Sequence, residues 1–434
     1  MPDLMPDLIP DLAAARAALA ATFGFAEFRP GQSAIIETVL SGADVLAVMP
    51  TGSGKSLCYQ LPALLRDGLT VVVSPLIALM RNQVAQLTRY GIAAASLNSA
   101  NDFDENRRVT GQVTRGALRL VYVSPERLAQ PDTLALFRRA NVSLLAVDEA
   151  HCISQWGHAF RPDYLELGAA RADLGGVQTI AFTATADAAT RADILGKLFR
   201  RHPTVFVHGF DRPNLTLRAQ AKAHARGRPQ APGHAQIMDF VQAHANESGI
   251  IYCGSRRKTE EIADVLRDSG ANARAYHAGL DQALRSRHQD MFLNEDGVVM
   301  VATIAFGLGI DKPDVRFVLH ADLPANIESY YHEIGRAGRD GLPADTLTLY
   351  GPGDIRLRRM QIAESAASEA QKNVDRQRLE ALVTLCESAS CRRQNLLAYF
   401  GEAAPPCGNC DICLKPRWWW RAQRRPWKRP LWGR

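Results

Sequence analysis

The chain lacks the sequence features that would place it in or across a membrane. None of its apolar runs reaches the roughly 18 residues that a membrane-spanning helix needs. The N-terminus reads MPDLMPDLIPDL and carries aspartates where a secretory signal peptide carries lysine or arginine. We therefore expect a cytoplasmic location and no membrane partner. Residues 1–19 are interpreted as a leader without a function of its own.

The body of the chain also lacks an excess of positive charge. The net charge is +6, but residues 415–434 hold eight Lys or Arg and no acid, so the other 414 residues sum to about −2. This balance excludes a polycationic body, and any contact that the body makes with nucleic acid must be local. The tail, residues 417–434, also holds five of the six tryptophans. Two interpretations stay open: an incidental, disordered tail, or an Arg/Trp grip on nucleic acid.

At 434 residues the chain is too long for one ordinary hydrophobic core, so several domains are expected. Short runs of Val, Ile and Leu alternate with helical stretches in two series, which indicates two parallel sheets, each covered on both faces. The first series of predicted strands is Val45–Met49, Thr70–Ser74, Arg119–Val123, Leu144–Val147 and Thr179–Phe182. The second series is Gly249–Tyr252, Ala273–Tyr276, Val298–Ala302, Phe317–His320 and Leu347–Tyr350.

After Pro352 the pattern is helical only. The predicted fold class is therefore α/β, with two doubly wound lobes facing each other across a cleft and a small helical module behind them. The expected boundaries are 1–19 for the leader, 20–208 and 209–352 for the two lobes, 353–416 for the helical module and 417–434 for the tail.

A glycine-rich loop follows the first predicted strand and reads Pro50-Thr51-Gly52-Ser53-Gly54-Lys55-Ser56. Small residues allow backbone N–H groups to close around a phosphate at a helix N-terminus, whose dipole favours anions. Lys55 is expected to reach the β- and γ-phosphates of ATP, and Ser56 to ligate magnesium. The full pattern G-x-x-x-x-G-K-S is not met, because Met49 stands at the position of its first glycine.

An acidic pair, Asp148 and Glu149, ends the apolar run Leu144–Val147. We predict that Asp148 holds magnesium through water and that Glu149 orients the attacking water. Arg336 and Arg339, in the segment GRAGRDG, are expected to reach across the cleft and neutralise the transferred phosphoryl group. The plainer alternatives are an acid pair at a helix N-terminus and a basic helix start on the surface.

The segment that follows the acid pair mixes aromatic with cationic side chains and ends at Tyr164. Such interleaving is typical of proteins that grip unstacked bases. Because it adjoins the acid pair without a spacer, we expect it to link ATP hydrolysis to a nucleic-acid strand. The candidate residues are His151, Trp156, His158, Phe160, Arg161 and Tyr164. The alternative for Trp156 is an ordinary place in the core.

Together these motifs resemble those of the RecQ family of superfamily 2 DNA helicases, over roughly Thr22 to Leu414. The segment FGFAEFRPGQ, residues 23–32, resembles that family's adenine-recognition motif. The phosphate loop, Asp148–His151 and Phe182–Ala186 resemble first-lobe motifs, while Ile250–Lys258, Ala302–Lys312 and Tyr330–Gly341 resemble second-lobe motifs. The segment CISQWGHAFRP is specific to the family.

The resemblance implies two RecA-like lobes and an ATP-dependent 3′→5′ DNA helicase that acts on single strands and forked duplexes in repair and recombination. It implies that Phe25 stacks on adenine while Arg29 and Gln32 read its edge. It places Gln155 beside Trp156 in a DNA-sensing loop and makes Arg339, with Arg336, the arginine finger. We expect a monomeric bacterial protein associated with the nucleoid.

This sequence departs from the family pattern at two positions of the last second-lobe motif. His332 stands where the family usually has Gln, and Ile334 where a polar residue is frequent. A neutral histidine can still make one hydrogen bond, so the departure bears on how the two lobes are coupled.

Five of the eight cysteines fall within 28 residues near the C-terminus. In a reducing compartment such clustering indicates a metal site rather than disulfides. The spacing Cys391-x15-Cys407-x2-Cys410-x2-Cys413 offers four thiolates to a structural Zn²⁺, and it resembles the family's zinc module. Cys386 competes for the first ligand position, and a redox role is the alternative function. Cys58, Cys152 and Cys253 are expected to be ordinary buried thiols.

Two other functions stay open. One is an RNA helicase of the DEAH type. The other is a nucleic-acid-binding module whose ATPase does not drive unwinding. This interpretation rests on His332 and on the expectation that the winged-helix domain, which often follows the zinc module in this family, is absent.

Overall fold

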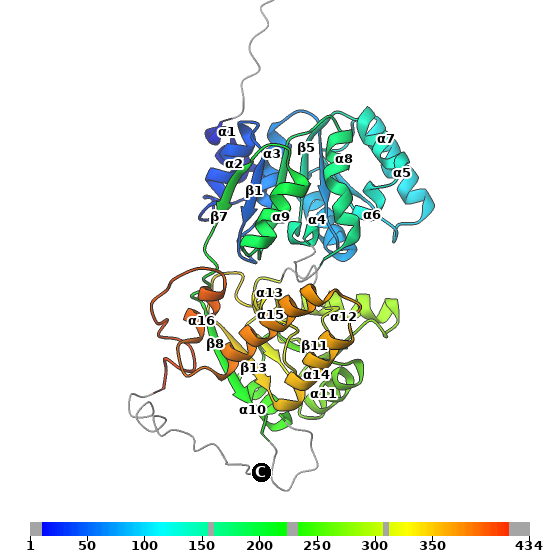
Figure 1. Cartoon of the computed structure of the whole chain (residues 1–434). Helices are drawn as coiled ribbons and strands as arrows, with labels where there is room; N and C mark the ends of the chain where they lie inside the picture. Colours follow the sequence, from blue (N-terminus) through cyan, green and yellow to red (C-terminus); the bar gives the residue numbers. More distant parts are fainter. Residues whose placement is uncertain (1–10, 155–159, 224–232, 307–311, 416–434) are drawn as a thin grey trace, which may run out of the picture.

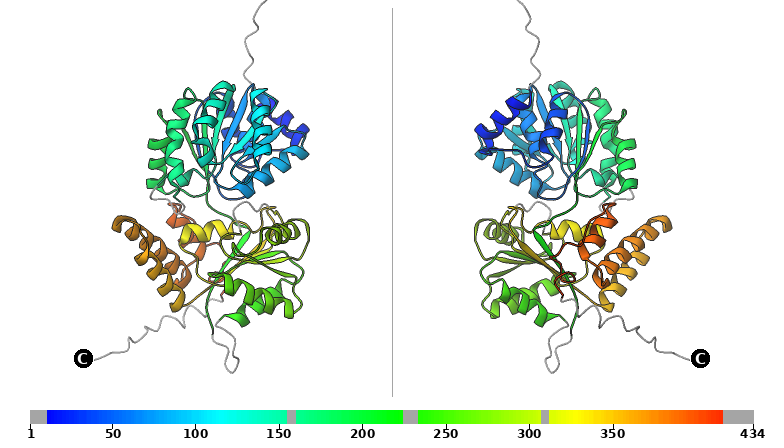
Figure 2. Two further views of the ribbon diagram at one scale, coloured as in Figure 1. Left: turned by 90° about the vertical axis from the view of Figure 1, so that its right-hand side faces the viewer. Right: turned by 90° about the vertical axis from the view of Figure 1, so that its left-hand side faces the viewer.

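The computed structural model describes residues 11–154, 160–223, 233–306 and 312–415. Two α/β lobes lie one above the other, and the helices after β13 pack against the second lobe (Figure 1). Helices α14 (Pro352–Glu364) and α15 (Glu369–Glu387) lie side by side on one flank of that lobe (Figure 2). The predicted class, two parallel-sheet lobes followed by a small helical module, is confirmed. Among the described residues, no helix is both long and apolar enough to cross a membrane.

The first lobe is built on a parallel sheet of seven strands in the order β3-β4-β2-β5-β6-β1-β7. Its strands are β1 (Val45–Val48), β2 (Leu69–Val73), β3 (Ala94–Leu97), β4 (Leu120–Val123), β5 (Val142–Val147), β6 (Thr179–Thr183) and β7 (Thr204–Val207). Strands β1, β2, β4 and β6 are buried along their whole length, as continuous apolar runs predict.

The second lobe is built on a parallel sheet of six strands in the order β10-β11-β9-β12-β13-β8. Its strands are β8 (Leu215–Ala221), β9 (Gly249–Tyr252), β10 (Ala273–Tyr276), β11 (Val299–Ala302), β12 (Phe317–His320) and β13 (Ala344–Tyr350). β8 follows β7 directly, so residues 208–214 form the connection between the two sheets. We call residues 208–214 the inter-lobe segment.

Helices fill the links between strands and cover the sheets. In the first lobe they are α1 (Leu12–Ala18), α2 (Gln32–Leu40), α3 (Leu57–Leu65), α4 (Ile77–Arg89), α5 (Phe103–Thr114), α6 (Pro125–Leu128), α7 (Pro131–Arg139), α8 (Leu167–Asp173) and α9 (Ala188–Leu198), with the short turns η1 (Leu19–Phe23), η2 (Ala150–Ile153) and η3 (Pro162–Glu166). In the second lobe they are α10 (His234–Ala243), α11 (Arg256–Asp268), α12 (Gln282–Asn294) and α13 (Ile327–Ile334). The C-terminal module adds α16 (Arg392–Tyr399) to α14 and α15.

The strand order brings the first-lobe motifs together. β5, β6 and β1 are neighbours, and Val147 lies opposite Ala181 while Val48 lies opposite Thr183. Because the strands are parallel, their carboxyl ends meet at one edge of the sheet. The acid pair, the segment Phe182–Ala186 and the phosphate loop therefore leave the sheet side by side.

Candidate functional site

The phosphate loop connects β1 to α3 and needs glycine at two points. Gly52 has a φ of +83° and Gly54 a φ of +79°, in the left-handed region that residues with a Cβ rarely enter. Lys55 lies inside the loop, where its Nζ donates to the carbonyl of Met49 at 3.2 Å. Burial lowers the pKa of Lys55, and the nearby Glu149 and Asp148 oppose that shift. The loop has the shape and the cation that a nucleoside triphosphate requires.

Two of the residues predicted to read adenine, Arg29 and Gln32, form hydrogen bonds with backbone carbonyls of the phosphate loop. The buried Gln32 donates from Nε2 to the carbonyls of Ser53 at 3.1 Å and Gly54 at 3.0 Å, and it accepts from the backbone N–H of Arg29 at 2.9 Å. Arg29 in turn donates from Nη1 to the carbonyl of Gly52 at 2.5 Å. The Phe25 ring is 49% exposed and is open to stacking. Adenine recognition by these three residues stays a prediction.

The acid pair lies at the end of β5 with a strained backbone. Glu149 is a non-glycine residue at φ +50°, ψ 45°, a left-handed conformation that costs roughly 1–2 kcal/mol. Burial first, and then the neighbouring Glu149, raise the pKa of Asp148 to about 7, against the opposing charge of Lys55. The raised pKa means that Lys55 alone does not compensate for the burial of the Asp148 carboxylate, which a bound cation would stabilise. Carboxylate and hydroxyl oxygens are suitable Mg²⁺ ligands, so Asp148 together with Ser56 fits that ion.

A pocket of about 450 Å³ separates the phosphate loop from the second lobe. The second lobe contributes Arg339 to its wall, and a Cβ placed on Gly52 would lie 3.2 Å from the Cγ of Arg339. Arg336 is not among the lining residues. It is only 8% exposed and lies beside Tyr252 inside the second lobe, where its charge opposes the burial that raises the pKa of Tyr252 to about 12. The structure thus brings only Arg339 of the predicted arginine pair to the phosphate loop.

A second contact between the lobes involves His332 on α13. Its Nε2 lies 2.9 Å from the hydroxyl oxygen of Thr185, which follows β6. The His332 ring lies 5.6 Å from the ring of His151, whose Nδ1 is 2.9 Å from the hydroxyl of Thr183. Burial lowers the pKa of His151 to about 3, so at neutral pH it is a hydrogen-bonding group rather than a cation. His332 therefore spans the lobes despite its departure from the family pattern.

The predicted strand-gripping segment is only partly described. Gln155, Trp156 and His158 lie outside the described residues. Phe160 and Arg161 are half-buried, and the Arg161 N–H donates to the carbonyl of Cys152 at 3.1 Å. The prediction for Tyr164 is wrong. Its ring is 1% exposed and its hydroxyl donates to the carbonyl of Asp148 at 3.0 Å, so it supports the acid pair from the core and cannot stack on a base.

The cysteine cluster has the arrangement of a closed metal site. The Sγ atoms of Cys391, Cys407, Cys410 and Cys413 all lie within 4.8 Å of one another. The Cys391 sulfur is 3.5 Å from that of Cys407 and 4.0 Å from that of Cys410. Tetrahedral zinc with Zn–S bonds of about 2.3 Å separates its sulfurs by about 3.8 Å, so the four thiolates fit Zn²⁺. Cys386 is buried outside this group, which favours Cys391 as the first ligand.

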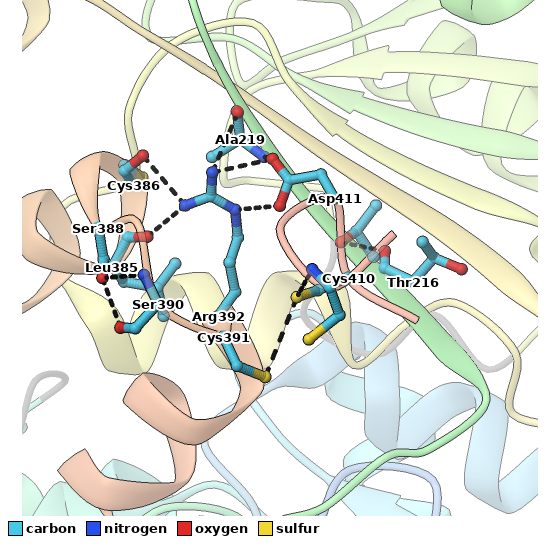
Figure 3. A network of polar contacts seen from close by, with 12 residues as sticks. Thr216, Ala219, Leu385, Cys386, Ser388, Ser390, Cys391, Arg392, Cys410 and Asp411 are labelled. Atoms are coloured by element: carbon cyan, nitrogen blue, oxygen red, sulfur yellow. Dashed lines mark hydrogen bonds and ion pairs between the residues drawn. The ribbon is translucent and has the colours of Figure 1, made fainter. Parts of the chain in front are cut away.

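Arg392, next to the first cysteine, fixes the zinc loop to the second lobe (Figure 3). Its Nε and Nη2 donate to the two carboxylate oxygens of Asp411 at 2.5 and 2.8 Å. Its Nη1 donates to the carbonyls of Leu385, at 2.5 Å, and Cys386, at 3.0 Å, which end α15. Arg392 is 3% exposed, and a buried Arg–carboxylate pair with two parallel bonds is both strong and directional. It joins α15, α16 and the zinc loop into one unit.

Comparison with known proteins agrees with this layout. Three family models match in order: the DEAD/DEAH box helicase model over residues 29–194, the helicase conserved C-terminal domain over 234–341 and the RecQ zinc-binding model over 352–414. Among solved structures, the DEAD-box helicase Mss116 bound to single-stranded RNA superposes with a TM-score of 0.65 at 18% identity, covering 84% of this chain and 82% of that one. The Mycobacterium smegmatis helicase Lhr bound to single-stranded DNA gives 0.62 at 20% identity, covering 88% and 58%. At such identities these two likenesses concern the fold alone.

The two sheets, the phosphate loop with its acid pair and the matching family models define a protein of the two-lobed superfamily 2 helicase class. The ATP-dependent DNA helicase RecQ of Bacillus subtilis is 41% identical over 406 residues, which cover 93% of this chain and 67% of that protein. The Haemophilus influenzae RecQ is 47% identical over 399 residues, covering 92% and 63%. The chain belongs to the RecQ family. It spans somewhat less than two thirds of the length of its Haemophilus relative.

Sequence reasoning missed three residues at the boundary between the lobes. The hydroxyl of Thr185 forms a hydrogen bond with His332. Arg212 and Asn214 of the inter-lobe segment line the pocket. Thr185 lies in a segment that resembles a known motif, so its position could have been singled out. Arg212 lies in FDRPN, a stretch without periodicity or a repeated spacing, and nothing in the sequence marks its partners.

Proposed function

We propose that this protein is an ATP-dependent DNA helicase that moves 3′→5′ along a single strand and opens forked duplexes. The observation that carries the proposal is the pocket between the lobes, which has Thr51, Gly52 and Ser53 of the phosphate loop on one side and Arg339 on the other. Lys55 of the same loop lies close enough to the acid pair for their charges to interact. The DNA helicase names of relatives at 41–48% identity support DNA as the substrate. Residues 20–208 and 209–352 are proposed as the motor lobes.

Residues in and around the pocket would divide the work of hydrolysis. Phe25 would stack on adenine, and Lys55 would neutralise the β- and γ-phosphates inside the loop. Glu149, which has a left-handed backbone just after β5, would orient the attacking water. Arg339 would stabilise the charge that develops on the transferred phosphoryl oxygens. When bound, Mg²⁺ would supply a Lewis acid at those oxygens, held by Ser56 and, through water, by Asp148.

ATP hydrolysis would be coupled to DNA through the residues that follow the acid pair in the sequence. We propose that Trp156, with Gln155, His158, Phe160 and Arg161, senses the strand. In the sequence His151 stands between the acid pair and that segment, and its Nδ1 lies 3.3 Å from Glu149 Oε2 and 2.9 Å from the Thr183 hydroxyl. A strand that moves this loop would therefore act on Glu149 and, through Thr185 and His332, on the second lobe.

The zinc module would act as a buttress rather than as a catalyst. A metal bound by Cys391, Cys407, Cys410 and Cys413 closes a loop that has few apolar residues of its own. We further propose that the helicase works as a monomer in the bacterial cytoplasm, at the nucleoid, in DNA repair and recombination. The family relationship supports these last assignments.

The experiment is a steady-state ATPase assay with single-stranded DNA, single-stranded RNA or neither. We expect DNA to stimulate hydrolysis strongly and RNA to stimulate it weakly. Lys55→Ala, which removes the phosphate-binding cation, and Glu149→Gln, which removes the base at nearly constant shape, should both abolish stimulated turnover. Equal stimulation by RNA would favour an RNA helicase. Full turnover in both variants would overturn the assignment of the site.

A further inference from the structure

The inter-lobe segment carries an arginine that touches both sides of the pocket. Arg212 donates from Nη1 to the carbonyl of Thr51 in the phosphate loop, at 2.8 Å. Its Nη2 donates to the carbonyls of Ala337 at 2.9 Å and Gly338 at 2.8 Å, in the turn that leads to Arg339. One side chain on the connection between the lobes is thus bonded to the loop that holds the phosphates and to the turn that presents the arginine finger.

This turn is packed too closely to move by itself. A Cβ on Gly335 would lie 3.0 Å from the Thr51 Cβ, across the boundary between the lobes. Gly338 has a φ of +58°, and a Cβ there would lie 2.4 Å from the amide nitrogen of Asn214. That amide donates to the carbonyls of Gly338 and Leu342, both at 2.9 Å. The position of Arg339 is therefore set by the inter-lobe segment.

The zinc module holds the same segment on both sides of Arg212. The buried Arg393 donates from Nη1 to the carboxylate of Asp211 at 2.6 Å and from Nη2 to the carbonyl of Leu215 at 2.5 Å. Asn409, which lies between two zinc-binding cysteines, donates to the carbonyl of Pro213 at 3.0 Å. These bonds fix the backbone of the segment immediately before and after Arg212.

Aromatic packing anchors the beginning of the segment. The ring of Phe210 stacks on that of Phe400 at 4.4 Å between centroids, and the Phe210 N–H donates to Glu402 Oε1 at 2.8 Å. The hydroxyl of Tyr331, on α13, donates to the Phe210 carbonyl at 3.1 Å. The zinc module and α13 therefore both hold the start of the segment in place. The hydrogen bond to Thr51 is the contact by which Arg212 reaches the first lobe.

We propose that Arg212 is a positioning residue for ATP hydrolysis, which ties the phosphate loop to the arginine-finger turn when the lobes close, and that Arg393 and Asn409 of the zinc module keep it in place. This inference rests on the proposed ATPase. Both Nη atoms of Arg212 already donate to carbonyl oxygens. The side chain therefore positions the walls of the pocket and does not bind a phosphate. Its loss should lower kcat and leave the KM for ATP nearly unchanged, because a misplaced Arg339 weakens the transition state and not the binding of the substrate.

The test compares Arg212→Gln, Arg212→Lys and Arg393→Gln with a control, Arg359→Gln, which removes an exposed pair with Glu380 in the same module. For Arg212→Gln we expect kcat of the DNA-stimulated ATPase to fall by about a hundredfold, as for an ångström-scale misplacement of a catalytic group, with KM changed by less than about twofold. The conservative Arg212→Lys should recover part of kcat. Arg393→Gln should show the same kcat effect in weaker form, and Arg359→Gln none.

Hydrogen exchange supplies a readout that does not depend on activity. The N–H groups of Gly338 and Asp340 donate to the carbonyls of Val315 and Pro313, and they should exchange faster in Arg212→Gln, while the amides of β9 are unchanged. A raised KM with normal kcat would make Arg212 a nucleotide ligand and overturn the proposal, as would normal kcat with unchanged exchange. If the unaltered protein lacks DNA-stimulated hydrolysis, the proposed function fails, and faster exchange would still establish that Arg212 fixes the turn.

Discussion

The Nε2 atom of His332, in the second lobe, lies 2.9 Å from the hydroxyl oxygen of Thr185, in the first. From Thr185 the contacts continue inward: the Thr183 hydroxyl donates to the Thr185 carbonyl at 2.9 Å and lies 2.9 Å from His151 Nδ1. That ring nitrogen is 3.3 Å from Glu149 Oε2. A path of polar contacts thus leads from helix α13 to His151, which lies beside the residue proposed to orient water.

Breaking this path should reduce coupling without emptying the nucleotide site. We expect His332→Ala to lower the stimulation of ATPase by DNA by about three- to tenfold, the free energy of one hydrogen bond. His332→Gln restores the family residue and a donor, so it should retain most of the stimulation. Steady-state rates with and without single-stranded DNA decide the matter. Equal stimulation in all three proteins would mean that the path carries no coupling.

Two phenylalanines close together in the sequence should respond in opposite ways. Phe25 is 49% exposed, so Phe25→Ala should raise the KM for ATP by roughly five- to a hundredfold, the loss of one aromatic–base stack, with little change in melting temperature. Phe23 is 7% exposed and packs edge-on against Tyr90, so Phe23→Ala should cost about 3–5 kcal/mol of stability. Thermal melts beside ATP titrations test both. An unchanged KM in Phe25→Ala would remove it from the adenine site.

Asp148 should make the nucleotide-free protein less stable as pH rises. Its pKa is raised from 3.8 to about 7, chiefly by burial, so the folded chain holds this proton more tightly than the unfolded chain. The stability that the proton provides is lost as pH climbs from the usual value through about 7. Without metal, the melting temperature should fall more steeply between about pH 4 and pH 8 in the wild type than in Asp148→Asn.

Magnesium should reverse that loss, because a metal binds the ionised carboxylate in place of the proton. Added at about pH 8, Mg²⁺ should raise the melting temperature of the wild type and leave Asp148→Asn unchanged. Parallel pH profiles for the two proteins would show that Asp148 does not titrate in this range.

The cysteine cluster predicts one zinc ion per chain, lost in Cys410→Ser. Cys410 is buried among the four sulfurs, and its replacement leaves three thiolates around the site. Cys386→Ala is the matched control, since it removes a buried sulfur that lies outside the cluster. Metal content measured on the purified variants should fall in the first and persist in the second. Zinc retained in Cys410→Ser and lost from Cys386→Ala would exclude Cys410 and assign Cys386 as a ligand.

The features that could be predicted from the sequence are those with a regular pattern of apolar residues or a fixed spacing of motif residues. Fully buried strands such as β1 and β6 were found because parallel strands covered on both faces are continuous apolar runs. The strands β3, β7 and β8 were missed, and all three lie at sheet edges, where burial alternates or is slight. The edge strand β10 has the same alternating burial but was predicted. Alternating or slight burial therefore weakens the sequence signal that separates a strand from a loop without removing it.

The site shows the same division between local and long-range information. The loop around Lys55 and the cysteine spacing were predicted because each motif is local. Tyr164 was assigned to a strand grip because the sequence does not reveal that its hydroxyl turns inward to Asp148. Arg212 could not be found because its partners are backbone carbonyls more than a hundred residues away, which no side-chain pattern records.

The most direct measurement is an unwinding assay of the purified protein on a forked DNA duplex. Strand separation is recorded in the presence of ATP and Mg²⁺. We predict ATP-dependent strand separation by the wild type and none by Lys55→Ala or Glu149→Gln, although all three should bind single-stranded DNA equally well. Hydrolysis that depends on DNA without any strand separation would contradict the helicase assignment and leave a DNA-stimulated ATPase.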